Sequence, residues 1–182
     1  MIWAIIIVAL LVIVALWYIS TRNRFVTLEN TCEESLSGID IYLKKRYDLI
    51  PNLVETVKGY TKHEQETLEK VIQARNAAMT AGKDDKVEAE NAFSGTLKSL
   101  FALSEAYPDL KADTHFLELQ QQLKSIETDL SQARKYYNGT AKSFNIYLQR
   151  FPSSIVGNSM HLTLKKYFEA ASEERENVKV SF

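Results

Sequence analysis

The sequence predicts an all-α protein, in which an N-terminal transmembrane helix is followed by a long-helix antiparallel bundle with an extended C-terminal tail. Three observations predict this fold class. The chain begins with an unbroken apolar run, Ile2–Ile19, that contains no charge and no amide side chain. Beyond it, apolar residues recur three or four positions apart, which is the spacing of one helix face. With 6 glycines and 3 prolines in 182 residues, turns are few and the helices should be long.

The run Ile2–Ile19 has the length and the flanks of a membrane anchor. At 1.5 Å per residue it forms a helix of roughly 27 Å, close to the thickness of the hydrocarbon core of a bilayer. The two tryptophans, Trp3 and Trp17, lie near its ends, where aromatic rings settle among lipid headgroups. A secretory signal carries its basic residues before the apolar run, whereas here Arg22 and Arg24 follow it. We therefore expect a single-pass anchor that is retained.

The charges of the chain favour one orientation in the membrane and exclude one class of partner. Arg22 and Arg24 follow the anchor, and no charged side chain precedes it. The positive-inside rule then puts the bulk domain in the cytoplasm, with the periplasm as the alternative. The net charge of −1 excludes the basic field that draws a protein to nucleic acid. The single cysteine, Cys32, excludes an intramolecular disulfide.

The first soluble segment is expected to carry one apolar stripe as far as Met79, with possible interruptions at Pro51 and Gly59. Its apolar stripe begins at Phe25, and no helix-breaking residue separates Phe25 from the anchor. Pro51 interrupts this helix, because proline has no N–H to donate to the carbonyl of Tyr47. The helix either kinks at Pro51 or ends near Leu49 and restarts. We favour the kink, because the apolar stripe keeps its phase across the proline.

Later breaks divide the rest of the chain. Thr61 and Glu64 have the spacing of a capping box, so a new helix start at Thr61 is possible. The clearest turn is residues 81–85, and the helix that follows it should stop at Tyr107-Pro108-Asp109. The expected domain organisation is a transmembrane anchor (1–22), a helical bundle (23–152) and a short helical turn with an extended tail (153–182).

The cleanest pattern belongs to a long helix that starts after a cap at Asp113. Its apolar positions alternate three and four residues apart over five heptads, which gives a rod of roughly 50 Å with one buried seam. The sequence Phe151-Pro152-Ser153 should end it. The seam positions are Phe116, Leu119, Leu123, Ile126, Leu130, Ala133, Tyr137, Thr140, Phe144, Tyr147 and Phe151.

One charged residue, Arg46, lies on the apolar stripe of the first helix. A charge on that stripe needs a paired carboxylate or backbone carbonyls. Glu105 or a carboxylate of the long helix is the expected partner. The alternative is that the stem of Arg46 packs while its guanidinium reaches water. Steps of seven residues along the stripe give Phe25, Cys32, Ile39, Arg46, Leu53 and Tyr60.

The other candidates for chemistry have simpler interpretations. Lys44 and Lys45 would stand about 40 Å from the membrane on a straight helix, so we expect a solvated face rather than a lipid-binding patch. His63 and His115 lack the paired Glu-x-x-His order of a di-iron bundle site, and we expect both to be exposed. Cys32 lies on the stripe and should be a packed thiol. We therefore expect no cofactor, no metal and no enzymatic activity.

The stretch Lys44–Tyr60, which reads KKRYDLIPNLVETVKGY, resembles the hallmark motif of the LemA family of bacterial membrane proteins. Three further stretches agree: Asn23–Val26 after the anchor, Leu103–Lys111 at a turn, and Phe151–Ser153 at the end of the long helix. The resemblance covers nearly the whole chain. It implies a membrane helix with a cytoplasmic or periplasmic helical bundle, and it brings no accepted catalytic residues. Residues 159–164 depart from the usual pattern of the family.

The leading functional hypothesis is a scaffold, anchored in the bacterial inner membrane, that acts through self-association and contacts with other membrane proteins. The alternative is a sensor or adaptor that transmits the state of a bound partner to the anchor. The shorter helices cannot cover the first helix along its length, so part of its apolar stripe near the membrane should remain for a second copy, and the tail that ends in Val180 and Phe182 is a second candidate contact. The alternative is that the first segment breaks at Pro51 or Gly59 and folds over itself, which leaves nothing exposed. The candidate structural and interaction residues are Arg46, Asp48, Pro51, Tyr60, Tyr107, Pro108, Phe151 and Pro152.

Overall fold

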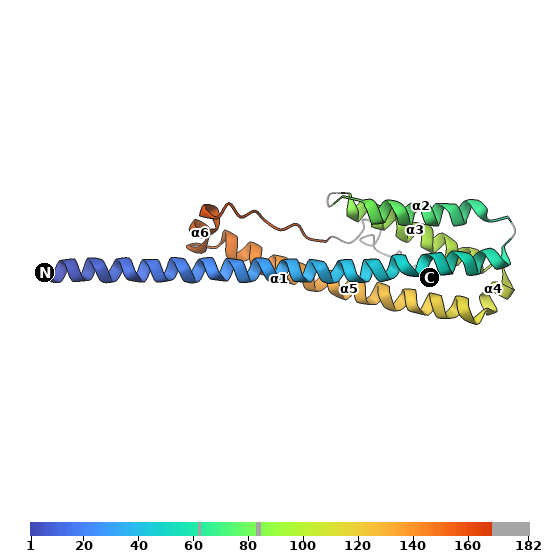
Figure 1. The fold of residues 1–182 in the computed structure, drawn as a ribbon, viewed down its shortest axis with the longest axis horizontal. Helices are drawn as coiled ribbons and strands as arrows, with labels where there is room; N and C mark the ends of the chain where they lie inside the picture. Colours follow the sequence, from blue (N-terminus) through green and yellow to red (C-terminus); the bar gives the residue numbers. More distant parts are fainter. Residues whose placement is uncertain (62, 83–84, 169–182) are drawn as a thin grey trace, which may run out of the picture. The chain divides into compact units, whose positions relative to one another are not determined.

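The computed structural model describes residues 1–61, 63–82 and 85–168, and within these ranges it holds helices and connecting segments but no strand. The predicted all-α class is confirmed. The described part of the tail, residues 162–168, is not helical, and residues 169–182 lie outside the described residues. In chain order the helices are α1 (Ile2–Tyr60), α2 (Gln65–Thr80), α3 (Lys86–Ser104), α4 (Pro108–Ala112), α5 (Thr114–Gln149) and α6 (Ser153–Ser159) (Figure 1).

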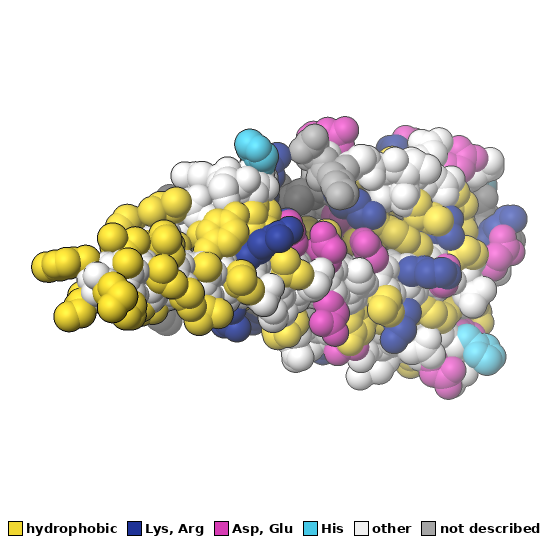
Figure 2. Space-filling model, turned by 60° about the vertical axis from the view of Figure 1, so that its left-hand side comes forward, with side chains coloured by type: hydrophobic (Ala, Val, Ile, Leu, Met, Phe, Trp, Pro, Cys, Tyr) yellow, Lys and Arg dark blue, Asp and Glu magenta, His cyan; other side chains and the backbone are white. Residues whose placement is uncertain are grey.

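The N-terminal part of α1 is apolar on every side. Its side chains are exposed up to Leu16, and Figure 2 shows a hydrophobic surface there that ends where the first charged side chains appear. The most apolar stretch of α1 is 0% buried, unlike the core helix of a soluble protein. Among the described helices, only α1 is long and apolar enough to cross a membrane. Thr21 is the first fully buried side chain, so the folded part begins directly after the anchor.

α1 is continuous through Pro51 and Gly59, and the alternative of a break near Leu49 is wrong. The phase of the apolar stripe is kept, because Ile50 before the proline and Leu53 after it are both fully buried. A bend at Pro51 within this continuous helix stays a prediction.

The turns between the later helices follow the sequence with two exceptions. The possible capping box at Thr61 does not form, because the Thr61 hydroxyl donates instead to the carbonyl of Val57. The next helix starts only at Gln65, and its N-cap residue Glu64 makes no side-chain capping bond. The second exception is the short helix α4, which the pattern did not predict and which has Pro108 in its first turn.

The described chain forms two compact units. The first unit comprises Met1–Ile39 and Gln132–Phe168, and so contains the anchor, the last part of α5, α6 and the described tail. The second unit comprises Asp40–Ser131, with the rest of α1, all of α2, α3 and α4, and the first part of α5. The division into anchor, bundle and tail expected from the sequence stays a prediction.

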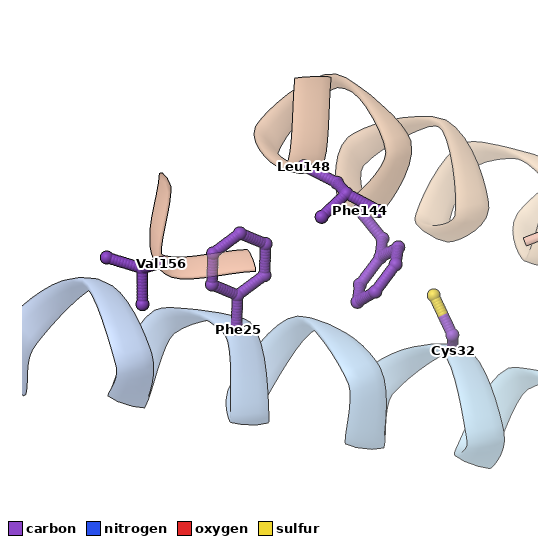
Figure 3. Close-up of a cluster of buried hydrophobic side chains, with 5 residues drawn as sticks. All are labelled: Phe25, Cys32, Phe144, Leu148 and Val156. Carbon is purple, nitrogen blue, oxygen red and sulfur yellow. The ribbon is translucent and has the colours of Figure 1, made fainter. Parts of the chain in front are cut away.

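The first unit is centred on a cluster in which α6 and the end of α5 cover α1 (Figure 3). Its members are Phe25, Cys32, Phe144, Leu148 and Val156. The rings of Phe25 and Phe144 meet edge to face with their centres 6.1 Å apart, and Cys32 is the packed thiol expected. The apolar stripe near the membrane is therefore covered by the same chain. The expectation that part of it stays open for a second copy is wrong. The comparison of helix lengths left out α6, which packs Val156 against the stripe.

The approach of α6 to α1 requires a glycine in α6. A Cβ atom on Gly157 would lie 2.4 Å from Leu148 Cδ1 and 3.0 Å from Phe25 Cζ. Both distances are shorter than van der Waals contact, so a larger residue requires Leu148, Phe25 or α6 itself to shift. A side chain at Gly139 of α5, by contrast, would meet nothing within 4 Å.

The second unit has a continuous apolar core drawn from all of its helices. The predicted faces of α1, α3 and α5 are largely buried, while Ile72 and Met79 of α2 are 40% and 47% exposed despite lying in the predicted stripe. The fully buried core side chains include Ile50, Leu53, Val57, Val71, Phe93, Leu100, Leu110 and Phe116.

The seam of α5 follows the predicted heptads with one correction at its end. The predicted cap forms, because the Phe116 backbone N–H donates to Asp113 Oδ1 at 2.7 Å. Phe151, placed on the seam by sequence, is instead 77% exposed. α5 ends at Gln149, two residues earlier, so Phe151 leaves the helix before it reaches the seam position. The buried heptad positions are Phe116, Leu123, Leu130, Tyr137 and Phe144.

Candidate functional site

Arg46 is the centre of a buried charged cluster in the second unit. It is 1% exposed, and Glu90 of α3 is 3% exposed. Arg46 Nη1 donates to Glu90 Oε2 at 3.0 Å, and its Nη2 donates to Ser94 Oγ at 2.8 Å. Its Nε lies 2.8 Å from Oε1 of Glu127 on α5, which is 42% exposed. The guanidinium carbon lies 4.6 Å from the ring centre of Phe93. Two of the three guanidinium nitrogens therefore donate hydrogen bonds, while Nε makes an ion pair with Glu127 without a hydrogen bond of good geometry.

The expected buried ion pair of Arg46 is present. Of its two expected partners, the carboxylate of the long helix is right and Glu105 is wrong. Glu127 is the expected carboxylate of the long helix. Glu105 is not a partner: it forms an exposed ion pair with Lys111. The residue that replaces it, Glu90, was not predicted. It precedes Phe93, Leu97 and Leu100 with the spacing of the buried face of α3, so the signal that singled out Arg46 would also have found Glu90.

Tyr47 closes the cluster from the next position of α1. Its hydroxyl donates to Glu90 Oε1, the carboxylate oxygen that Arg46 does not use. Burial raises the pKa of Tyr47 well above its usual range, and the hydrogen bond and charge of Glu90 raise it further. Tyr47 lies far beyond the membrane-spanning Ile2–Ile19 and stays a neutral donor. Neighbouring residues of α1 thus satisfy both oxygens of one buried carboxylate.

The carbonyl freed by Pro51 is bound by α2. Proline cannot donate to the carbonyl four residues before it, which here belongs to Tyr47. Arg75 Nε donates to this Tyr47 oxygen at 2.8 Å. A buried carbonyl without a partner would destabilise the fold, so Arg75 allows α1 to continue through Pro51. The same stretch of α1 thereby contacts α2 through its backbone and α3 through Arg46 and Tyr47.

A comparison with protein families identifies the family of this chain. The family model described as the LemA family matches residues 35–182, which is most of the chain and includes Arg46, Tyr47 and Pro51. The chain belongs to the LemA family.

Curated relatives extend the comparison. Protein LemA of Metamycoplasma hominis is 26% identical over 166 residues, covering 90% of this chain and 76% of the relative. Magnetosome protein MamQ 2 of Paramagnetospirillum magneticum is 20% identical over 174 residues, covering 81% of this chain and 64% of the relative. Magnetosome protein MamQ of Magnetospirillum gryphiswaldense is 19% identical over 157 residues, covering 71% and 58%. The chain thus spans less than two thirds of the two MamQ proteins.

Within this LemA-family chain, Tyr60 and Tyr107 of the second unit join helix ends, whereas Asp48 makes a contact within α1. Tyr60, the last residue of α1, donates its hydroxyl to Asp113 Oδ2 at 2.8 Å. The Tyr107 hydroxyl lies 3.3 Å from Glu64 Oε1 and donates to it. Asp48 forms an exposed pair with Lys44 at 2.8 Å, which makes Lys44 part of the solvated face expected. In each of these contacts, a polar side chain is bound by another side chain of the same protein.

A second polar arrangement of the LemA-family fold holds the described tail against α5. Asn145 Nδ2 donates to the Lys165 carbonyl at 2.9 Å, while the Lys165 N–H donates to Asn145 Oδ1 at 2.8 Å. Asn138, one heptad earlier, makes the same two-way bond with the backbone of Phe168, both distances 2.8 Å. The Tyr137 hydroxyl donates to the Lys166 carbonyl at 3.0 Å. Sequence reasoning missed this contact.

The geometry of the LemA-family chain offers no open catalytic constellation among the described residues. No three His, Cys, Asp or Glu side chains of the described ranges gather closely enough to bind a metal ion. His63 and His115 are exposed, as expected. The buried polar side chains of the Arg46 cluster are directed at one another, and within it burial and Glu90 raise the pKa of Tyr47. The cluster therefore fastens helices together.

Proposed function

We propose that this protein is a membrane-anchored helical scaffold that acts through self-association and protein–protein contacts at the bacterial inner membrane. The observation that carries the proposal is the closure of the Arg46 cluster. Nη1 and Nη2 of Arg46 and both carboxylate oxygens of Glu90 have hydrogen-bond partners within the chain, and Nε of Arg46 makes an ion pair with Glu127. These buried groups are occupied by one another, which supports a role in holding helices together.

Exposed apolar side chains supply surface for association. On the first unit, Val26 of α1 is 45% exposed, and Tyr136 and Ile146 of α5 are 63% and 51% exposed. These side chains replace the covered stripe as the candidate contact with a second copy.

The experiment that tests self-association is light scattering of the purified chain, anchor included, in several mild detergents. The scaffold proposal expects the protein mass of a dimer or a larger assembly in each detergent. The variant Ile146→Glu should lower this mass if the exposed face of α5 mediates the contact, and Gln149→Glu on the same helix is the matched control. A protein mass of one chain in every detergent contradicts self-association.

The alternative function is a sensor or adaptor that transmits the state of a bound partner to the anchor. The observation that favours it is the continuity of α1, since one helix runs from the anchor to Tyr60. A bound partner should then change the accessibility of residues within the anchor, measured by labelling of single cysteines in membranes. A monomeric protein that shows such a change would favour this function over the scaffold.

We also propose that the bulk of the chain is cytoplasmic. Arg22 and Arg24 follow the anchor and are exposed, and the positive-inside rule favours that side. Protease treatment of spheroplasts should leave the bundle intact, and digestion should require rupture of the inner membrane. Digestion of the bundle with the inner membrane intact would place it in the periplasm.

A further inference from the structure

The segment that joins α5 to α6 carries two large apolar side chains that the fold leaves uncovered. Phe151 is 77% exposed and Ile155 is 57% exposed. The opposite side of α6 faces the core of the first unit, because Ser153, Val156 and Gly157 are buried. Ile155 therefore lies on the outward side of α6, and Phe151 lies just before the helix begins. Neighbouring exposed apolar side chains of this kind commonly mark a contact with a partner or a membrane.

Contacts with α1 fix the height of α6 relative to the anchor. The hydroxyls of Ser159 and Tyr18 lie 3.3 Å apart, and Val156 packs in the cluster of Phe25 (Figure 3). Tyr18 is at the end of the anchor, and Phe25 is one heptad later, or about 10 Å along the helix. The headgroup layer extends roughly 5–8 Å beyond each side of the hydrocarbon core. The position of α6 therefore coincides with the headgroup layer.

Other side chains at the same height are those that favour a bilayer surface. Trp17 is half-buried and packs against the cluster of Phe25, and tryptophan is enriched at the membrane–water boundary. Arg22 and Arg24 are exposed on α1, and Arg150 is exposed directly before Phe151. Exposed arginines near a bilayer attract the phosphates of anionic lipids.

We propose that the α5–α6 turn is a second membrane-contacting element, in which Phe151 and Ile155 insert among lipid headgroups and Arg150 binds their phosphates. The occupant of this apolar surface is the bilayer, because the surface continues the anchor at its edge. The anchor and this turn are more than a hundred residues apart in sequence, and together they hold the first unit to the membrane at two points. This inference does not rest on the scaffold function.

The test uses the chain with its anchor, reconstituted into nanodiscs of phosphatidylcholine and phosphatidylglycerol. Cys32→Ala provides a background without thiols, and Phe151→Cys and Ile155→Cys each accept an environment-sensitive fluorophore. Tyr136→Cys is the matched control, since Tyr136 is 63% exposed on α5 and lies about 20 Å before the end of that helix. Quenching is measured with lipids spin-labelled at the headgroup end of the acyl chain.

The proposal expects blue-shifted emission and strong quenching by lipid at positions 151 and 155, and no quenching at position 136. Emission typical of water and no quenching at 151 and 155 would overturn it. A blue shift without quenching by lipid would also overturn it, because the side chains would then be covered by protein, such as a second copy. Circular dichroism of each labelled variant checks that the helices are retained.

Discussion

Replacement of Arg46 by alanine should destabilise the second unit far more than any neighbouring charge substitution. The change removes the partner of a Glu90 side chain that is 3% exposed, and it also removes the contacts with Ser94 and Phe93. Breaking a buried ion pair by removal of one partner costs roughly 3–5 kcal/mol, because the other charge remains buried without compensation. Tyr47 still donates to Glu90, which favours the lower half of that range.

The matched control is two positions away. Lys44 forms an exposed pair with Asp48, and such surface pairs contribute about 0–1 kcal/mol, so Lys44→Ala should change stability little. Glu127→Ala should fall between the two, since Glu127 is 42% exposed. The assay is equilibrium unfolding of each variant in mild detergent, followed by circular dichroism. Equal and small losses for Arg46→Ala and Lys44→Ala would refute the reasoning.

A double replacement separates loss of the charge pair from loss of packing. Arg46→Met with Glu90→Leu removes both charges together and keeps most of the apolar volume. Exchange of a buried pair for apolar residues is often neutral or stabilising, so the double variant should be more stable than Arg46→Met alone. If the two losses simply add, Arg46 and Glu90 do not act as a pair.

Three further predictions concern local contacts. Gly157→Ala should lower the free energy of unfolding by about 1–3 kcal/mol, because the added methyl group overpacks against Leu148 and Phe25. Gly139→Ala lies in open space within α5 and should raise the free energy of unfolding by roughly 0.5–1 kcal/mol. Equal thermal midpoints for the two variants would contradict the packing of α6. Asn145→Ala removes two hydrogen bonds to the Lys165 backbone, so hydrogen exchange of the Lys165 amide should accelerate, and an unchanged rate would show that the tail is held elsewhere. Hydrogen bonds from the Phe116 N–H and the Tyr60 hydroxyl lower the pKa of Asp113. The stability that ionised Asp113 contributes is therefore present above the ordinary aspartate pKa, near pH 4, and is lost as the pH falls through the lowered pKa. Asp113→Asn should weaken the loss of unfolding free energy at acid pH, and an unchanged loss would show that Asp113 does not cause it.

The sequence predicts helices and faces better than partners. Periodicity identifies which side of a helix is buried, and this correctly placed Arg46, Cys32 and the heptads of α5. Periodicity does not say which helix packs opposite. Glu105 and Glu90 were therefore both available to Arg46, and only the packing of α3 decides for Glu90. Phe151 shows the same limit at a helix end, because the last seam position depends on where α5 stops.

The contacts that could not be predicted from the sequence involve backbone atoms. Asn138 and Asn145 bind the main chain of the tail, and Arg75 binds the carbonyl of Tyr47. Backbone groups are the same at every position, so such contacts leave no pattern of side chains to read. The role of Gly157 was hidden for a related reason, since it depends on the distance between α6 and α1.

The most direct test of the scaffold account counts chains in a membrane. The full chain, labelled with one fluorophore, is reconstituted into liposomes at high dilution, and photobleaching steps are counted for single particles. The account predicts particles that bleach in two or more steps, with the proportion unchanged on further dilution of protein in lipid. Particles that bleach in one step at every dilution would contradict self-association as the basis of function.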